Sequence, residues 1–488
     1  MRPRARRASL VLCAAALFVA TRVVLHLSGD PFFDPDSYKY LSGADSLLQG
    51  RGLPPLFTSV AVTGGALHVM PGYAWFIYPL WRITGGISLE AVVIAQSVIS
   101  FLGFLALAHL FALWIGTGAA VFVFVVLCLS PSVAWLERML MPDTMVAPLF
   151  MMAVWCAVLG APARERPLRA AAGALGAGLL MSFEILMRTS SQVYTVFPPL
   201  LALQTRSDRG ATVMWLLVYV LGLGVPLIPW MQHNQDVHGV FAIARSTGRN
   251  LYLSAAWGGT LDRARAQEEL GLPVREGSRA AFAIADAAFG KAVEDTGSIA
   301  AADSELRARA LDAYRSKDLS SLTAERLAIF SALFVPNSGV GVSLSPLRSQ
   351  RDWYLANTTA GPEVRRRLEQ RFDYAFSPQF VAAAERRGPR SESARRLYIG
   401  AIDYLTLDGL ALLVLYAMSI VTIYWRSLSR WRILIAVAAP PAAFLVSYMF
   451  FGMPLYRYQT GLHPFMLAAV AAALVPLVGR VSRWRSGG

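Results

Sequence analysis

Long apolar runs separated by short polar clusters dominate the sequence. A helix that crosses the hydrocarbon core of a bilayer needs about 20 mostly apolar residues. Ten runs of suitable length and composition occur, at 9–27, 88–113, 118–135, 143–160, 169–187, 190–204, 211–230, 404–425, 433–451 and 462–479. The pattern therefore predicts an all-α polytopic membrane protein with a bundle of about ten transmembrane helices.

A further apolar stretch, PGYAWFIYPLWRITGG at 71–86, is short and rich in aromatic residues. Trp75, Tyr78 and Trp81 suit the boundary between lipid and water, where Trp and Tyr are enriched. We therefore expect an interfacial or re-entrant helix here rather than an eleventh span.

Composition agrees with a membrane protein, because 55% of the 488 residues are hydrophobic and only 16% are charged. The formal net charge of +14 is of the kind seen in nucleic-acid-binding proteins. However, 43 of the 76 charged residues lie in 231–403, where their net charge is only +3. That segment is predicted to be a nearly neutral, water-exposed region.

Most of the remaining basic residues fall in five clusters that lie beside the apolar runs. These are MRPRARR at the start, ARERPLR at 163–169, TRSDR at 205–209, RSLSRWR at 426–432 and RVSRWR at 480–485. Lys and Arg beside a span stay on the cytoplasmic side, and ten spans with both termini cytoplasmic place every cluster there. Counting 71–86 as a span would move four clusters outside. The positive charge is thus an orientation signal, and no nucleic acid is implied.

The first run also has the basic start and short apolar centre of a secretory signal peptide. No convincing A-x-A cleavage site precedes the acidic segment, so we expect the run to be retained as a span. Cys13, Cys128 and Cys156 all fall within expected spans and indicate neither a disulfide framework nor a metal cluster.

The topology divides the chain into three parts. Residues 1–230 form an N-terminal transmembrane module with a first extracytoplasmic loop at 28–70, residues 231–403 form an extracytoplasmic region, and residues 404–488 form a C-terminal transmembrane module. Within the middle part, helix-favouring stretches such as SELRARALDAYRSKDLSSLTAERLAIFSALF predict a mostly helical structure.

Ionisable residues collect on the outward side of this topology. The first loop carries Asp30, Asp34, Asp36 and Asp45, which a solvated loop with Asp-Pro turns would also explain. The next outward junction, WLERMLMPDTM, contains Glu137, Arg138 and Asp143, and Asp143 could simply favour the start of a helix.

Three further groups lie at or beside the outer ends of spans. Glu184 and Arg188 could form an ion pair one helical turn apart, but an ionisable residue within a span is a functional candidate. PWMQHNQDVHG supplies His233, Asn234, Asp236 and His238, whose spacing matches no known zinc motif. MPLYRYQTGLHP places Tyr456, Arg457 and Tyr458 between the last two expected spans.

One outward face thus combines several carboxylates with Arg side chains at membrane depth. That combination suits a site in which Arg holds a lipid phosphate and a carboxylate removes a proton. A transporter would more often carry polar residues midway along several spans of two related halves. Neither a GxxxxGK[ST] loop nor a convincing GxGxxG loop occurs, which argues against nucleotide hydrolysis.

The order of these segments resembles the GT-C glycosyltransferases that use polyprenyl-phosphate sugars, the protein O-mannosyltransferase and lipid A aminoarabinose transferase superfamily of family 39 type. The similarity covers roughly 1–255 and 404–480. It rests on PDSYKYLSGADSLLQGRGL, MPGYAWFIYPLW, SPSVAWLERMLMPDT, Met187-Arg188-Thr189, PWMQHNQDVHG followed by STGRNLYLS, and LYRYQTGLHP. No single motif is specific; their order and shared face carry the resemblance.

The resemblance implies a GT-C-like bundle and a role for each candidate residue. Asp36, in the family's D-x-Y-x-x-L context, would be the catalytic base, with Asp34 second. Arg457, Arg188 and Tyr458 would bind the donor phosphate. The residues expected to orient the substrates are Asp143, Glu137, His233 and Asn234. No cofactor is certain, and a divalent cation is an option.

This chain departs from the family in two places. His233 stands where the family has Arg, which puts phosphate binding at that position in doubt, and 256–403 matches nothing in the family. We hypothesise that this region recognises the acceptor.

The resulting prediction is a membrane glycosyltransferase of the cell envelope, in a bacterial inner membrane, with its active site on the extracytoplasmic face. Its expected partners are a polyprenyl-phosphate-linked sugar, a lipid, glycan or protein acceptor, and the bilayer. The alternatives are a transporter or flippase for a lipid-linked substrate and a polysaccharide ligase or polymerase of another family.

Overall fold

Helices make up the regular structure of the computed structural model, and the residues it describes contain no β-strand. The described residues are 3–29, 31, 33, 36–54, 57, 69–204, 208–274, 277–332, 365–366, 369–370, 374–385, 391–405, 409–426, 430–443, 445, 462 and 464–474. The predicted all-α class is therefore confirmed for this part of the chain.

The membrane bundle is built mainly from the N-terminal half of the chain. Its helices are α1 (Pro3–Leu27), α5 (Leu89–Trp114), α6 (Thr117–Leu129), α8 (Asp143–Leu159), α9 (Pro167–Met187), α10 (Phe197–Ala202) and α11 (Arg209–His238). Three of them, α5, α9 and α11, are long and apolar enough by length and composition to cross a membrane. Shorter apolar helices lie at Leu12–Leu27, Thr117–Leu129, Asp143–Leu159, Leu412–Trp425, Trp431–Ala443 and Pro464–Leu474. The number of ten spans stays a prediction.

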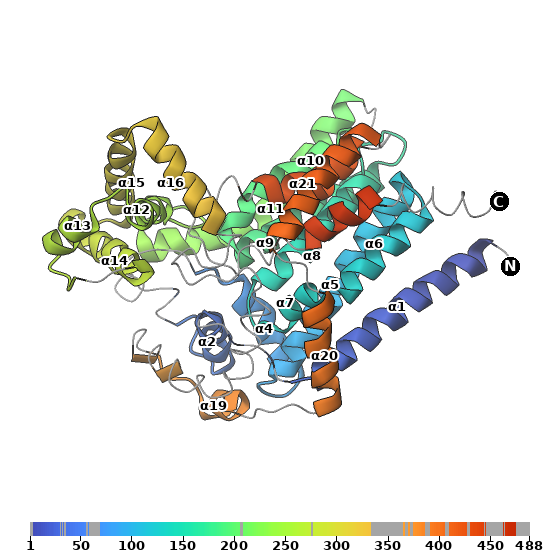
Figure 1. Ribbon diagram of the computed structural model, residues 1–488, viewed down its shortest axis with the longest axis horizontal. Helices are drawn as coiled ribbons and strands as arrows, with labels where there is room; N and C mark the ends of the chain where they lie inside the picture. The colour runs from blue at the N-terminus through green and yellow to red at the C-terminus, as the bar shows by residue number, and fades with distance from the viewer. Residues whose placement is uncertain are drawn as a thin grey trace.

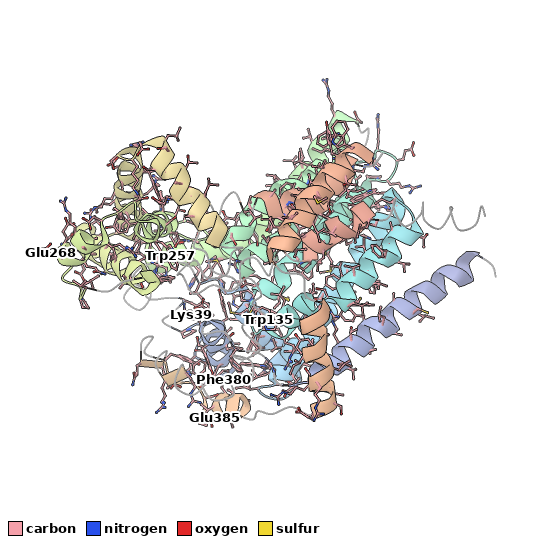
Figure 2. All side chains as sticks on the ribbon, viewed as in Figure 1. Lys39, Trp135, Trp257, Glu268, Phe380 and Glu385 are labelled. Atoms are coloured by element: carbon pink, nitrogen blue, oxygen red, sulfur yellow. The ribbon has the colours of Figure 1, made fainter. Side chains whose placement is uncertain are left out.

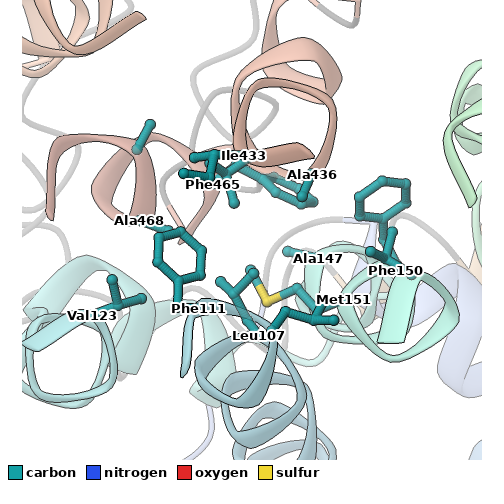
Figure 3. Close-up of a cluster of buried hydrophobic side chains, with 14 of the residues drawn as sticks. Leu107, Phe111, Val123, Ala147, Phe150, Met151, Ile433, Ala436, Phe465 and Ala468 are labelled. Carbon is teal, nitrogen blue, oxygen red and sulfur yellow. The ribbon is translucent and has the colours of Figure 1, made fainter. Parts of the chain in front are cut away.

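Late segments of the chain complete the bundle core. These are α21 (Gly409–Arg426), α22 (Arg430–Ile433), the π-helical turn η2 (Leu434–Ala438) and the helix at 464–474. Figure 3 shows Phe111 of α5 and Phe150 of α8 facing Phe465 and Ala436 across this core. Residues separated by more than 300 positions in the sequence therefore share one apolar interior.

Glycines allow a close helix contact in the bundle. Gly178 of α9 faces Gly222 of α11, and a Cβ atom on Gly178 would lie 2.3 Å from the Tyr219 carbonyl oxygen. Small residues at such crossings let helix backbones meet, which is how helices associate in a bilayer without a hydrophobic driving force. The C-terminal end of α9 leads directly to Arg188.

Two of the expected spans are broken. The run at 118–135 divides at Ser130, where α6 ends and α7 (Pro131–Arg138) begins, and the Ser130 hydroxyl accepts a hydrogen bond from the Val133 amide. The run at 190–204 becomes a 3-10 helix, η1 (Thr189–Val196), followed by α10, because Pro198 and Pro199 cannot continue the preceding hydrogen-bond pattern. Apolar composition alone did not indicate either break.

The last span of the first half is longer than its apolar run. α11 continues to His238 and ends at Gly239, whose φ of 69° is accessible to glycine without a steric penalty. His233 and Asn234 therefore lie on the last turns of a helix that continues past the expected span at 211–230. Figure 1 shows this end of α11 leading into a separate group of helices.

That group is a helical module with its own core. It consists of α12 (Thr247–Gly258), α13 (Arg263–Glu269), α14 (Gly277–Thr296), α15 (Ile299–Arg315) and α16 (Leu319–Ala332). Leu253, Ile284, Phe289 and Leu306 lie at its centre. The expectation of helices in 231–403 is confirmed for the described residues, and this part of the chain is held together without any cysteine.

Short helices collect at the end of the bundle opposite the start of α1. They are α2 (Ser37–Leu48), α4 (Gly72–Ile83), α19 (Pro378–Glu385) and α20 (Glu392–Leu405), and Figure 1 shows them together below the bundle. α4 spans only 12 residues, which is too short to cross a bilayer. Trp75 is partly exposed, as expected at an interface, but Trp81 is fully buried and donates to the Ser88 carbonyl at 3.0 Å.

Candidate functional site

One group of buried apolar side chains joins the segments that carry the candidate site. We call it the outer cluster, and it comprises Tyr38, Leu41, Ala44, Tyr73, Ile77, Trp81, Leu89, Val92, Val93, Leu140, Met145, Leu149, Met187, Tyr374, Phe376, Phe380 and Ala384. Asp36 lies two residues before Tyr38, Asp143 lies two before Met145, and Arg188 follows Met187. Three candidates from separate parts of the sequence therefore border one cluster.

Asp36 is the residue at which α2 begins. Its carboxylate forms an ion pair with Lys39 at 2.6 Å, and its side chain is 22% exposed. The side chain does not cap the helix, although the Asp36 carbonyl accepts a hydrogen bond from the Lys39 amide. Lys39 of α2 is labelled in Figure 2. Asp36 is thus partly open to solvent at the edge of the outer cluster, whereas Asp30 and Asp34 lie outside the described residues.

Asp143 and Arg188 form a buried ion pair between α8 and the segment after α9. Asp143 is the first residue of α8, where a carboxylate is favoured by the helix dipole. Only 3% of the Asp143 side chain and 16% of the Arg188 side chain are exposed. The second carboxylate oxygen of Asp143, Oδ2, is also buried and has no hydrogen-bond partner among the described residues. Burying an acceptor of this kind costs free energy unless a ligand or a water molecule donates a hydrogen bond to it.

The backbone at Arg188 decides which carboxylate it meets. Arg188 has extended angles, φ −153° and ψ 115°, directly after the helical Met187. Its side chain therefore leaves the face of α9 on which Glu184 lies, and its Nε donates to the Ser190 hydroxyl at 3.0 Å. The ion pair between Glu184 and Arg188 that the sequence allowed is not formed; Glu184 is fully buried within α9.

Glu137 is held by Arg22 of α1. Arg22 Nε lies 2.8 Å and its Nη2 lies 2.5 Å from the two Glu137 carboxylate oxygens. Arg22 also donates to the Cys128 carbonyl at 2.7 Å, and both charged side chains are at least nine-tenths buried. These contacts tie α1 to α7, so the ion pair of Glu137 with Arg22 has a structural role. The expected role of Glu137 in orienting substrate stays a prediction.

Arg22→Met should destabilise the protein by about 3–5 kcal/mol, because Glu137 would be left as a buried charge without a partner. Heat unfolding of the purified protein in detergent would measure this as a lower transition temperature. The double variant Arg22→Met/Glu137→Met should recover most of the loss, since neither charge remains. A double variant as unstable as the single one would show that the ion pair is not the cause.

The other two expected orienting residues lie on the last turns of α11. Asn234 is fully buried, and its amide donates to the carbonyls of Ala242 and Ile243 at 2.7 and 3.2 Å. His233 stacks on Trp230 with ring centroids 5.0 Å apart, and Trp75 of α4 meets the same Trp230 edge-on. Asn234 thus fixes the turn after α11, while His233 lies near α4.

A strap formed by residues 374–385 closes the outer cluster, and the sequence did not indicate it. Asp45 of α2, fully buried, accepts hydrogen bonds from the Tyr374 hydroxyl at 2.7 Å and the Ser377 hydroxyl at 2.6 Å. Burial and the bond to Asp45 raise the pKa of Tyr374. Phe380, labelled in Figure 2, stacks on Phe376 within the cluster. The sequence shows aromatic residues in 374–385 and acidic residues in the loop at 28–70. Nothing in the sequence indicates that these two segments meet.

Two expected donor-binding residues, Arg457 and Tyr458, lie outside the described residues. Within the described part of the chain, no group of three or more His, Cys, Asp or Glu side chains is placed to hold a metal ion.

Solved structures similar to this chain come from two membrane enzymes. The archaeal oligosaccharyltransferase AglB from Archaeoglobus fulgidus, in complex with an inhibitory peptide and a dolichol-phosphate, is 13% identical with a TM-score of 0.49, covering 97% of this chain and 51% of its own. ArnT from Cupriavidus metallidurans, bound to undecaprenyl phosphate, is 13% identical with a TM-score of 0.35, covering 97% of this chain and 78% of its own. The chain thus spans about half the length of the oligosaccharyltransferase.

Both of these enzymes are GT-C glycosyltransferases, the superfamily that the sequence resembles. At 13% identity the likeness concerns the fold alone. No protein-family model matches the sequence, and no curated protein matches it.

Proposed function

We propose that this chain is a membrane glycosyltransferase that moves a sugar from a polyprenyl-phosphate donor to an extracytoplasmic acceptor hydroxyl, with inversion at the anomeric carbon. The observation that carries the proposal is the buried Asp143–Arg188 pair at the outer end of α9. An Arg at membrane depth is rare and usually marks a site for an anion or a polar substrate. Asp36 borders the same outer cluster and supplies a partly exposed carboxylate.

The reaction assigns a separate task to each group. The acceptor oxygen attacks the anomeric carbon and forms the new glycosidic bond, while its proton passes to the Asp36 carboxylate. The bond from the anomeric carbon to the phosphate oxygen breaks, and its electron pair leaves with the polyprenyl phosphate. Arg188 stabilises the charge that develops on that phosphate, which is most effective where water is excluded.

Asp143 has two tasks in this proposal. While no donor is bound, it keeps the Arg188 guanidinium paired, because a lone buried cation would be costly. When the donor enters, its phosphate takes over the guanidinium. The Asp143 carboxylate, whose Oδ2 has no described partner, can then accept a hydrogen bond from a sugar hydroxyl. A hydroxyl-bearing, phosphate-linked ligand satisfies both partners at once.

The organisation of the chain supports the same proposal. We assign residues 1–230 and 404–488 to the membrane-embedded donor site, and the middle region 231–403 to recognition of the acceptor. The α12–α16 module, which lies beside the outer end of α11, is the part of that region with a core of its own. We further propose that the site lies outside the cytoplasm, in a cell-envelope membrane such as a bacterial inner membrane.

A transporter or flippase for a lipid-linked substrate is the second candidate, and Glu184 is the observation that favours it. Its carboxyl group is fully buried within α9 and forms no ion pair among the described residues. Buried ionisable groups in spans also mark ion and substrate pathways. However, the described spans contain few other mid-span charges, and the paired Asp143 and Arg188 lie at the outer end.

The two candidates differ in whether a covalent bond forms. Membranes containing the protein should transfer label from a radiolabelled polyprenyl-phosphate sugar to endogenous acceptor, giving a labelled product that no longer carries the polyprenyl phosphate. Membranes without the protein are the control. Label that crosses the bilayer while staying on the polyprenyl phosphate would reject the transferase and support the transporter.

A further inference from the structure

Gln96 is a polar side chain buried in the first third of the apolar helix α5. It is 1% exposed, and α5 is one of the three helices long and apolar enough to cross a membrane. An amide in such a place costs several kcal/mol unless its hydrogen bonds are made. Gln96 makes its hydrogen bonds with two other segments, and these bonds offset the cost of burying an amide in a span.

The amide of Gln96 binds the end of α7. Its Nε2 donates to the Glu137 carbonyl at 2.9 Å and to the Met139 carbonyl at 3.1 Å. The last carbonyls of a helix have no partner within that helix, and Met139 has left it with φ −74° and ψ 125°. Gln96 thereby holds the non-helical turn that leads from Met139 to Asp143, the first residue of α8.

Tyr73 of α4 holds Gln96 from the other side. The Tyr73 hydroxyl donates to the Gln96 Oε1, and both side chains are fully or almost fully buried. Because the Tyr73 bond occupies the oxygen, the amide can present only its NH₂ group to the turn. The orientation of Gln96 is therefore set by α4.

Gly72, which precedes Tyr73 in α4, packs against the segment that carries Arg188. A Cβ atom on Gly72 would lie 2.6 Å from the carbonyl carbon of Leu186 and 2.8 Å from the amide nitrogen of Met187. Arg188 follows Met187 directly. Gly72 and Tyr73 of α4 thus fix the positions of the segments that carry Arg188 and Asp143. Gly72 acts by direct packing, and Tyr73 acts through Gln96.

We propose that Gln96, held by Tyr73, is a positioning residue that aligns Asp143 with Arg188 for a lipid-linked phosphate. The inference rests on the proposed function in one respect, namely that the ligand is a lipid-linked phosphate. Without the Gln96 bonds, the turn at 139–142 is free to shift, and Asp143 no longer meets the guanidinium in one fixed geometry. Phosphate binding then becomes weaker, because the site is no longer organised before the ligand arrives.

Two variants and one control test this alignment. Gln96→Met keeps the length of the side chain and removes its hydrogen bonds, while Tyr73→Phe removes only the hydroxyl. Tyr416→Phe is the matched control, because the Tyr416 hydroxyl also donates to a buried carbonyl, that of Ala438, in the bundle core. The probe is undecaprenyl monophosphate, titrated against each purified protein in detergent.

Gln96→Met should weaken binding of the probe roughly tenfold, as expected for about 1.4 kcal/mol, and Tyr73→Phe should weaken it less. Tyr416→Phe should bind as the wild type does. The same Gln96→Met change should have no further effect when Asp143→Asn and Arg188→Gln are already present, because no ion pair remains to be aligned.

Unchanged binding in Gln96→Met would overturn the proposal, as would an equal loss in both backgrounds, which would indicate a general structural role. A wild-type protein that binds no probe would also overturn it. If binding responds as expected but no sugar is transferred by the wild type, the positioning role stands and the glycosyltransferase proposal falls.

Discussion

Asp36→Asn should lower the rate of sugar transfer by about 1,000-fold, within the range of 10²–10⁴ that a positioned general base contributes. Asn has nearly the same shape as Asp but cannot accept the proton of the acceptor hydroxyl. The measurement is initial transfer from a radiolabelled polyprenyl-phosphate sugar at a saturating donor concentration.

Folding should change little in this variant. The Asp36 side chain does not cap α2, and its ion pair with Lys39 is partly exposed, so its loss costs at most about 1 kcal/mol. Binding of undecaprenyl monophosphate should be retained, because Asp36 acts on the acceptor. Asp262→Asn is a suitable control, since Asp262 caps α13 in the separate module. Transfer at the wild-type rate in Asp36→Asn would exclude Asp36 as the base.

Arg188→Gln should reduce transfer by at least about 100-fold, since removing one group that stabilises developing charge costs about 10²–10³. The charge on the departing phosphate would have no guanidinium, and the donor would also bind more weakly. The single variant has a second defect, because Asp143 would remain buried and unpaired. Lost activity could then follow from misfolding alone.

The double variant Arg188→Gln/Asp143→Asn separates the two effects. Both side chains are then neutral and of similar size, so folding should return to near the wild-type level, as measured by heat unfolding in detergent. Transfer should stay low, because the phosphate still lacks its cation. If the double variant regained transfer, the ion pair would be a structural feature and another cation would bind the donor.

The long apolar runs of the sequence were sufficient to predict the class of fold and the positions of most helices. A run of 20 apolar residues has few alternatives to a helix in a bilayer, because every backbone polar group must be paired within the segment. The breaks at Ser130 and in η1 were missed, since hydropathy averages over the Pro residues that cause them. α11 passed beyond its apolar run because a helix ends where its capping residue lies, at Gly239, and not where hydrophobicity falls.

For the candidate site, the sequence indicated residue types and a side of the membrane but not partners. It allowed Arg188 to pair with Glu184, one turn away, and it treated Glu137 as free to orient a substrate. The structure pairs Arg188 with Asp143 and Glu137 with Arg22. The backbone angles at Arg188 and the packing of α1 against α7 decide these partners, and neither is encoded in local spacing.

What the sequence alone determined is the membrane bundle, its expected orientation and the group of charges on one outward face, because hydrophobic length and the distribution of Lys and Arg act locally along the chain. Only the tertiary structure decided which charges meet. Asp143 and Arg188 are 45 positions apart, and Gln96 and Tyr73 belong to two further helices. Their alignment depends on helix contacts such as that of Gly72 with Leu186, which arise only when the whole bundle is assembled.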